Sequence, residues 1–171
     1  RIVAEGHTLA HHSYSHPWTF RKMSEAAGRA DILRGFEAVD EAGFGGFSSA
    51  PRVPFFRYPG FADTPPLNAW LAGQGVGVFG CDLWASDWSP MSPEAQLSLV
   101  LRRLSTAGRG IILFHDVRPQ TVAMLPRFLA SLRERGYSLA HLVPGGGAPA
   151  LVQAGQGWRS HTDAIIAGVR R

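Results

Sequence analysis

Two histidines four positions apart are the first residues in this sequence whose types and spacing could do chemistry. His12 and His16 are the two ends of the segment HSYSH. Neutral imidazole nitrogens are good ligands for zinc and similar metals, and two rings at this spacing in a turn can close on one ion. His7 and His11 lie in the same stretch, so spacing alone does not select the pair, and a surface or capping histidine is the plain alternative. On a strand, His11 would point away from the face that His12 uses.

Three further polar groups follow apolar or aromatic stretches later in the chain. Arg57 comes directly after two phenylalanines, Asp87 and Trp88 follow the next expected strand, and His115 ends an apolar strand. Indole faces stack on sugar rings, and a histidine at a strand end beside a carboxylate is well placed for general acid–base chemistry. The plain alternatives are an arginine that reaches to solvent and an aspartate in a turn. Four polar groups at successive strand ends, the edge where (β/α) enzymes place active sites, are more specific than any one of them.

These groups need a scaffold of strands and helices to position them. The chain alternates between the two periodicities, which predicts an α/β fold with a parallel sheet. We expect helices over residues 24–42, 64–72, 92–107, 121–135 and 160–171, with the end of another at 1–5. We expect strands over residues 7–13, 54–58, 76–79, 110–114 and 137–142, and a loop over 145–157. About five such units are fewer than the eight of a closed (β/α) barrel, so the sheet is open or lacks its first one or two units.

Composition narrows the class of protein. The 171 residues carry a formal net charge of +4, with scattered arginines and no Lys/Arg run, so we expect no nucleic acid partner. No stretch approaches the roughly 20 apolar residues of a membrane span, and no secretory signal is visible. The single cysteine, Cys81, cannot form an internal disulfide.

Together the motifs resemble the NodB-homology polysaccharide deacetylases, carbohydrate esterase family 4. The segment GHTLAHHSYSHP is similar to the family's second motif, H-[S/T]-x-x-H, at His12 and His16. RYPG, beginning at Arg57, resembles the third motif; Asp87-Trp88 resembles the fourth; and LFH, ending at His115, resembles the fifth. The resemblance covers residues 1–144 and implies a distorted (β/α) barrel, so we expect one deacetylase domain over 1–144, with 145–171 as its C-terminal loop and helix.

The resemblance implies a role for each matching residue. His12 and His16 would be two of three protein ligands to a divalent metal, usually Zn²⁺, with Co²⁺, Ni²⁺ or Fe²⁺ as alternatives. His115 would be the general acid, and Asp87 would hold its imidazole and raise its pKa. Arg57 would orient the catalytic base. Leu113 and Trp88 would line the pocket for the acetyl methyl group, and Tyr58 and Pro59 would contact substrate.

Two departures from the family pattern lead to further expectations. The first motif, Thr-Phe-Asp-Asp, which supplies the third ligand and the base, has no counterpart, so we expect that the N-terminal strands are missing and that this chain alone binds metal weakly and is inactive. The third motif lacks the usual Pro-Tyr after Arg57, which predicts a substrate groove of different shape there.

The resemblance also implies a substrate and a location. The leading hypothesis is a hydrolase that removes N- or O-acetyl groups from a glycan and is periplasmic or secreted, with the missing N-terminal segment as its partner. The alternatives are an inactive carbohydrate-binding module, which an upstream Asp-Asp motif would exclude, and a structural zinc protein, which lacks the usual complete Cys/His set. The polymer is not specified by the motifs.

Overall fold

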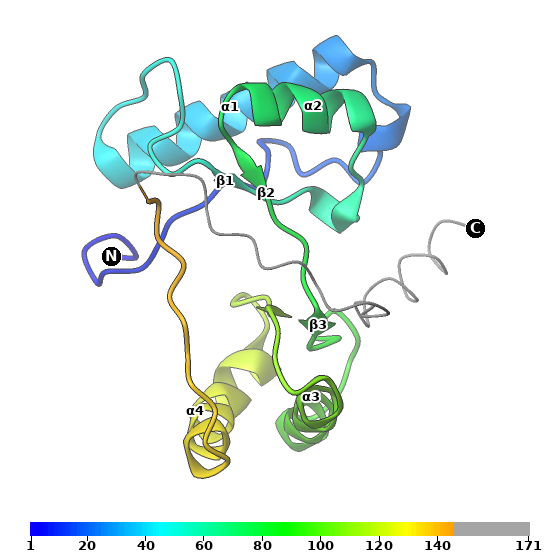
Figure 1. The fold of residues 1–171 in the computed structure, drawn as a ribbon. Coiled ribbons are helices and arrows are strands. Elements are labelled where there is room, and N and C mark those ends of the chain that lie inside the picture. Colours follow the sequence, from blue (N-terminus) through cyan, green and yellow to red (C-terminus); the bar gives the residue numbers. More distant parts are fainter. Residues whose placement is uncertain (146–171) are drawn as a thin grey trace. The chain divides into compact units, whose positions relative to one another are not determined.

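A computed structural model describes residues 1–145 of the chain (Figure 1). The described residues divide into two compact units, 1–80 with 141–145 and 81–140, called here the first unit and the second unit. Each has its own helices, its own parallel strand pair and its own core.

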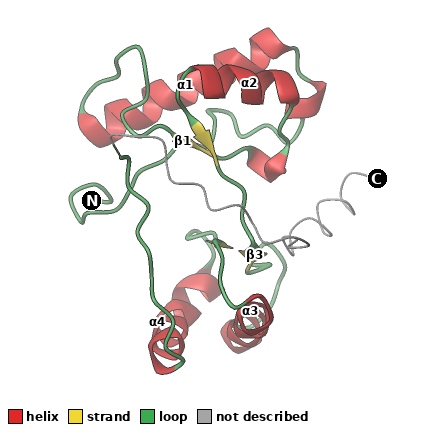
Figure 2. Ribbon diagram, viewed as in Figure 1, coloured by secondary structure: helices red, strands yellow, loops and turns green. Residues whose placement is uncertain are grey.

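The first unit is built from two helices and a parallel pair of short strands (Figure 2). The helices are α1 (Glu25–Phe44) and α2 (Pro65–Gly73), the strands β1 (Phe55–Phe56) and β2 (Gly77–Val78), and the short 3-10 turns η1 (Phe20–Lys22) and η2 (Pro59–Phe61). The Ser24 hydroxyl caps α1 by accepting from the Ala27 amide at 3.2 Å. Gly45 ends the helix in the left-handed conformation, with φ 76°. The first-unit core includes Phe20, Ile32, Phe36, Phe56, Tyr58, Leu67 and Leu71.

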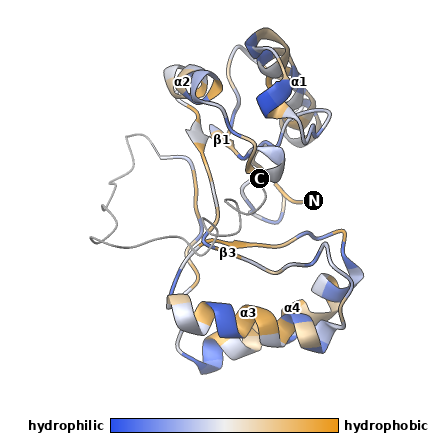
Figure 3. Cartoon of the chain, turned by 90° about the vertical axis from the view of Figure 1, so that its right-hand side faces the viewer, coloured by the Kyte–Doolittle hydropathy of each residue, from blue (hydrophilic) through white to orange (hydrophobic). Residues whose placement is uncertain are grey.

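The second unit repeats this plan with other residues. Strands β3 (Leu83–Trp84) and β4 (Ile112–Leu113) are parallel neighbours, with Trp84 paired to Leu113. Helix α3 (Pro93–Ala107) is capped by the Ser92 hydroxyl, and it packs on α4 (Pro119–Glu134). Hydrophobic and hydrophilic residues are interspersed along both helices in Figure 3, as amphipathic packing requires. The core includes Leu83, Val100, Leu104, Met124, Phe128 and Leu132.

Four of the helices predicted in the described region are confirmed. The expected ranges 24–42, 64–72, 92–107 and 121–135 differ from the observed bounds by one or two residues at most ends. The α/β class with parallel pairing is also confirmed. The expected strands 54–58, 76–79 and 110–114 are present but shorter, two residues each.

Other expectations about elements need correction. Residues 7–13 form no strand; the backbone of this stretch makes a single bridge, from His11 to Phe56. Residues 137–142 form no strand either: the Tyr137 amide bonds back to Leu132 at the end of α4, and Thr8 contacts His141 and Leu142 with its hydroxyl. Residues 1–5 form a hydrogen-bonded turn that ends at Gly6. Strand β3 was not expected, since the sequence pattern puts Leu83 and Trp84 in the segment that follows the strand at 76–79.

Two remaining points concern the C-terminal residues and the search for membrane-spanning helices. The helix expected at 160–171 and most of the loop expected at 145–157 lie outside the described residues. Among residues 1–145, no helix combines the length and apolar character needed to cross a bilayer.

Candidate functional site

The backbone of the first unit fixes the protonation of His12. Next to it, His11 is paired in parallel with β1, donating to Phe55 at 3.0 Å and accepting from Arg57 at 3.0 Å. The Nδ1 atom of His12 lies 2.7 Å from the backbone carbonyl of Arg57. A carbonyl oxygen can only accept, so Nδ1 carries the proton and Nε2 carries the lone pair. This arrangement, with one ring nitrogen donating to a carbonyl, is typical of metal-binding histidines.

His16 reaches His12 because the intervening turn adopts unusual backbone angles. Ser13 and His16 both have positive φ, 68° and 53°, which non-glycine residues rarely adopt. The Ser13 hydroxyl accepts from the His16 amide at 3.2 Å. As a result the rings of His12 and His16 lie 4.9 Å apart between centroids, at 75°. Strain of this kind persists where the surroundings over-determine it, which is common at functional sites.

Helix α1 supplies those surroundings. The Asp31 carboxylate accepts hydrogen bonds from the backbone amides of Tyr14 and Ser15 and, at 2.7 Å, from the Ser15 hydroxyl. One turn later Gly35 lets the loop approach the helix, because a Cβ at Gly35 would lie 2.6 Å from the Ser13 carbonyl carbon. Sequence reasoning missed both residues, since neither belongs to a motif and their partners lie far along the chain.

His11 lies on the opposite face from His12, as expected for alternating residues. It is 2% exposed, its ring packs edge-on against Phe36, and its Nε2 lies 3.6 Å from an Asp40 oxygen. Burial lowers the pKa of His11, although Asp40 acts in the opposite direction. His11 therefore belongs to the core, and the pair at His12 and His16 is the one that could hold a ligand.

The donor set fits part of a transition-metal site. Two imidazoles are held close together, and His12 has its tautomer set for coordination through Nε2. A protein zinc site normally has at least three protein ligands, and residues 1–145 contain no cluster of three or more histidine, cysteine, aspartate or glutamate side chains that could hold an ion. The pair therefore needs a further ligand to make a complete site.

Arg57 serves the first unit through both backbone and side chain. Its carbonyl orients His12, and its guanidinium donates to the Gly80 carbonyl at 3.1 Å. Tyr58 is 2% exposed and packs edge-on against Phe20 and Phe56, and Pro59 is buried too. Burial raises the pKa of Tyr58, with the Asp63 carboxylate adding to the effect. The predicted substrate contacts of Tyr58 and Pro59 stay predictions, and their observed place is in the packing.

In the second unit, Asp87 and His115 form a hydrogen-bonded pair. Asp87 is fully buried, whereas the His115 side chain is 41% exposed. The Nδ1 atom of His115 lies 2.7 Å from one carboxylate oxygen of Asp87, and the His115 amide donates to the other at 2.6 Å. Asp87 therefore fixes the imidazole of His115 through Nδ1. The other ring nitrogen, Nε2, is not part of this pair.

Two further buried side chains, Thr121 and Gln96, form a line of hydrogen bonds that ends at the Asp87 carboxylate. The Thr121 hydroxyl donates to Asp87 at 2.9 Å and accepts from the Gln96 amide at 2.8 Å. Burial alone would raise the pKa of Asp87, but the hydrogen bonds from His115 and Thr121 outweigh it and hold that pKa below its ordinary value. Asp87 is thus ionised at neutral pH, and the Nδ1 atom of His115 donates to it. Thr121 and Gln96 come from α4 and α3 and were not anticipated.

Aromatic side chains lie beside this pair. Trp88 is 44% exposed, with its ring 6.2 Å from His115 and 5.1 Å from Trp84. Leu113 ends β4 two residues before His115 and is partly buried. Asp82, the other acid of this segment, accepts from the Ile111 amide at 2.7 Å and so joins two loops.

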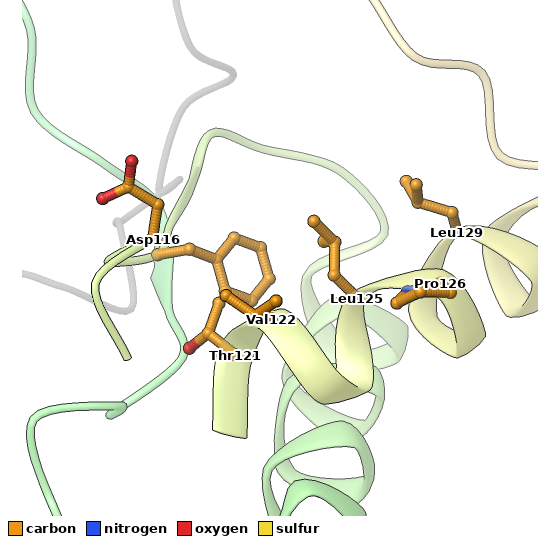
Figure 4. Close-up of a pocket in the computed structure, with 7 residues that line it drawn as sticks. Asp116, Thr121, Val122, Leu125, Pro126 and Leu129 are labelled. Atoms are coloured by element: carbon orange, nitrogen blue, oxygen red, sulfur yellow. The ribbon is translucent and has the colours of Figure 1, made fainter. Parts of the chain in front are cut away.

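A separate pocket of the second unit lies between the segment after β4 and helix α4 (Figure 4). Its lining is mostly apolar and consists of Phe114, Asp116, Thr121, Val122, Leu125, Pro126 and Leu129. None of the nine predicted site residues lines it. The structure therefore groups those residues in two sets, His12, His16, Arg57, Tyr58 and Pro59 in the first unit and Asp87, Trp88, Leu113 and His115 in the second.

Comparison with known proteins gives these motifs a family. The chain is 26% identical over 142 residues to a peptidoglycan-N-acetylglucosamine deacetylase of Bacillus cereus, and 29% identical over 157 residues to a chitooligosaccharide deacetylase of Sinorhizobium fredii. These matches cover 80% and 83% of this chain. A solved Bdellovibrio bacteriovorus peptidoglycan deacetylase superposes with a TM-score of 0.72 and 31% identity, over 84% of this chain and 38% of that one.

These relatives and structural neighbours are NodB-type polysaccharide deacetylases of carbohydrate esterase family 4, the family that the motifs resemble. The fold of this chain is the NodB-type distorted barrel in part, as expected from the motifs. No protein-family model matches the sequence. The chain spans 50% and 68% of the lengths of the two curated relatives. The same fold occurs in a Bacillus anthracis protein described as a family 4 pseudoenzyme, at 20% identity and a TM-score of 0.64, so the fold by itself does not show catalysis.

Proposed function

We propose that this chain is part of a metal-dependent deacetylase that hydrolyses N-acetyl or O-acetyl groups of a polysaccharide and releases acetate. The observation that carries the proposal is the pair in the second unit. A buried, ionised Asp87 holds a partly exposed His115 through Nδ1, and Trp88 lies beside the imidazole. This is the geometry of a histidine prepared to transfer a proton through Nε2.

In this proposal His115 is the general acid. Its Nε2 would donate a proton to the departing nitrogen or oxygen of the sugar, while Asp87 fixes the orientation of the ring and balances its charge. Thr121 positions Asp87 by donating to its carboxylate, and Gln96 in turn donates to the Thr121 hydroxyl. Trp88 and Leu113 would enclose the methyl group of the acetyl substituent, which favours acetyl over larger acyl groups.

His12 and His16 are the residues that would hold the metal, with Zn²⁺ first and Co²⁺, Ni²⁺ or Fe²⁺ as alternatives. A bound ion of this type acts as a Lewis acid on the acetyl carbonyl. Arg57 contributes by fixing the tautomer of His12 through its carbonyl, and its guanidinium would orient the base. We propose that the third ligand and the base come from protein outside the described residues.

Location, partners and extent follow from the same proposal. Acetylated glycans lie outside the cytoplasm in bacteria, so the protein would be periplasmic or secreted and its partner would be the glycan itself. Residues 1–144 would form one deacetylase domain together with a segment that precedes Arg1.

The test is acetate release from acetylated chito-oligosaccharides and acetylated xylan by a version extended upstream of Arg1. We expect His115→Ala to lower kcat by about 10²- to 10⁴-fold, the usual contribution of a general acid. His7→Ala is the matched control, because His7 is exposed and outside both sets of site residues, and it should keep full activity. Full activity of the His115 variant would contradict the assigned role. Glycan binding without acetate release by the parent would favour the inactive binding module.

A further inference from the structure

Trp18 is a large aromatic residue that the proposed chemistry does not use, although it lies beside the histidine pair. Its side chain is 73% exposed, more than any other tryptophan, tyrosine or phenylalanine among the described residues. Its indole meets the His16 ring edge-on, at 5.2 Å between centroids and 73° between planes. The other face of the indole is open to a ligand, and its position beside the histidine pair is what makes it of interest.

One side of the indole rests on glycine backbone. A Cβ built at Gly60 would lie 2.8 Å from Cε3 of Trp18 and 3.0 Å from Cζ3, so the ring occupies the space that any side chain at position 60 would need. Gly60 also has a φ of 55°, which suits glycine. Position 60 lies in the third motif, directly after Pro59, and the indole of Trp18 lies against it.

The backbone that follows Trp18 is held against the segment around Gly60. Phe20, two residues later, is fully buried and packs edge-on against Tyr58, with centroids 5.4 Å apart. Arg21 donates to the Phe61 carbonyl at 2.7 Å and pairs with Asp63 at 3.3 Å. These contacts tie the segment after His16 to the segment after Gly60. The indole is therefore presented on a rigid support, which reduces the entropy lost on binding.

We propose that the exposed face of Trp18 is a stacking platform for a pyranose ring of the glycan, next to the histidine pair. The apolar C–H face of a pyranose matches a flat indole, whereas its hydroxyl edge stays in water. The identity of the ligand as a glycan rests on the proposed function. The platform predicts a preference for oligomers over single acetylated sugars, since an oligomer can place one ring at the histidine pair and another on the indole.

The surroundings favour a sugar over a protein partner. The nearest exposed aromatic residue along the chain, Tyr14, already has the Arg34 guanidinium over its ring at 3.9 Å. The residues between them are Ser15, His16 and Pro17, and the indole lies against the His16 ring and Gly60. Protein interfaces need contiguous apolar area with buried anchors, whereas one flat ring with polar neighbours suits a sugar.

The test compares Trp18→Ala and Trp18→Phe with the parent, all extended upstream of Arg1. Binding of the N-acetylglucosamine tetramer is measured by calorimetry, and acetate release from tetramer and dimer gives KM and kcat. We expect Trp18→Ala to raise the Kd and the KM for the tetramer about three- to tenfold, with a smaller change for the dimer and in kcat. Trp18→Phe should recover most of the loss, because a flat ring remains.

Two further variants separate stacking from folding. Gly60→Ala places a methyl group against the indole and should raise the tetramer KM in the parent, but much less in the Trp18→Ala background, since the two residues act through one contact. Leu139→Ala, equally exposed at 73% in the second unit, should change neither constant. Unchanged tetramer Kd and KM in Trp18→Ala would overturn the proposal, as would a parent that does not bind the tetramer. Trp18-dependent binding by a parent that releases no acetate would support the platform and reject the proposed activity.

Discussion

At the scale of single residues, the two sets of site residues depend on neighbours that carry no motif. Asp31 holds the turn between His12 and His16, and Thr121 holds Asp87. The histidines, Arg57, Asp87 and His115 could be predicted from residue type and spacing. Their supporting residues could not, because a lone aspartate or threonine in a helix has no pattern, and its partner is 16 or 34 positions away.

Asp87 gives the second unit a pH dependence whose sign follows from its hydrogen bonds. Its pKa is lower in the folded state than its ordinary 3.8, so the stabilisation is present above that pH and is lost as the pH falls through the folded value. We expect the midpoint of urea unfolding to fall as the pH is lowered from about 5 toward 3. Asp87→Asn should weaken this dependence. Equal slopes in the parent and in Asp87→Asn would show that Asp87 is not the group responsible.

A variant of Tyr58 can distinguish a role in packing from a role in substrate contact. Its hydroxyl is buried without a hydrogen-bond partner among the described residues, and removing such a group relieves a desolvation cost. Tyr58→Phe is therefore expected to unfold at the same temperature as the parent or a higher one, with KM unchanged. A rise in KM at equal stability would instead support the substrate contact predicted from the sequence.

At the scale of elements, α1 is the element that shapes the histidine pair. Its start and end were readable in the sequence, from Ser24 and the glycines after Ala42, and its observed bounds are Glu25–Phe44. The strands were harder to predict, since each is two residues long and most of the surrounding backbone is irregular. The strained turn at Ser13 and His16 was also unreadable, because positive φ in these residues is imposed by tertiary contacts.

Gly35→Ala tests whether α1 positions the turn. The added methyl group would lie 2.6 Å from the Ser13 carbonyl carbon, in backbone that cannot rotate away. We expect a loss of roughly 1–3 kcal/mol in stability, as for other overpacked sites, and weaker zinc binding. Gly73→Ala is the matched control: that glycine is also helical, and nothing lies within 4 Å of its built Cβ, so stability should stay level or rise. Zinc affinity equal to the parent in Gly35→Ala would argue against this role of the helix.

At the scale of the whole molecule, the chain carries its chemistry in two units. The proposed metal-binding pair belongs to the first unit and the proposed acid–base pair to the second. Arg57 follows β1, Asp87 follows β3 and His115 follows β4, each a short parallel strand. The order of the motifs was enough to predict the α/β class and the family. The limits of the deacetylase domain stay a prediction, as does the identity of the metal.

The most direct measurement is metal content and acetate release together, on this chain and on a version extended upstream of Arg1. The account predicts that the extended version binds about one Zn²⁺ and releases acetate from acetylated chito-oligosaccharides. It also predicts that His12→Ala abolishes both and that this chain alone does neither well. Acetate release that persists in His12→Ala, or with the metal removed by a chelator, would contradict the account.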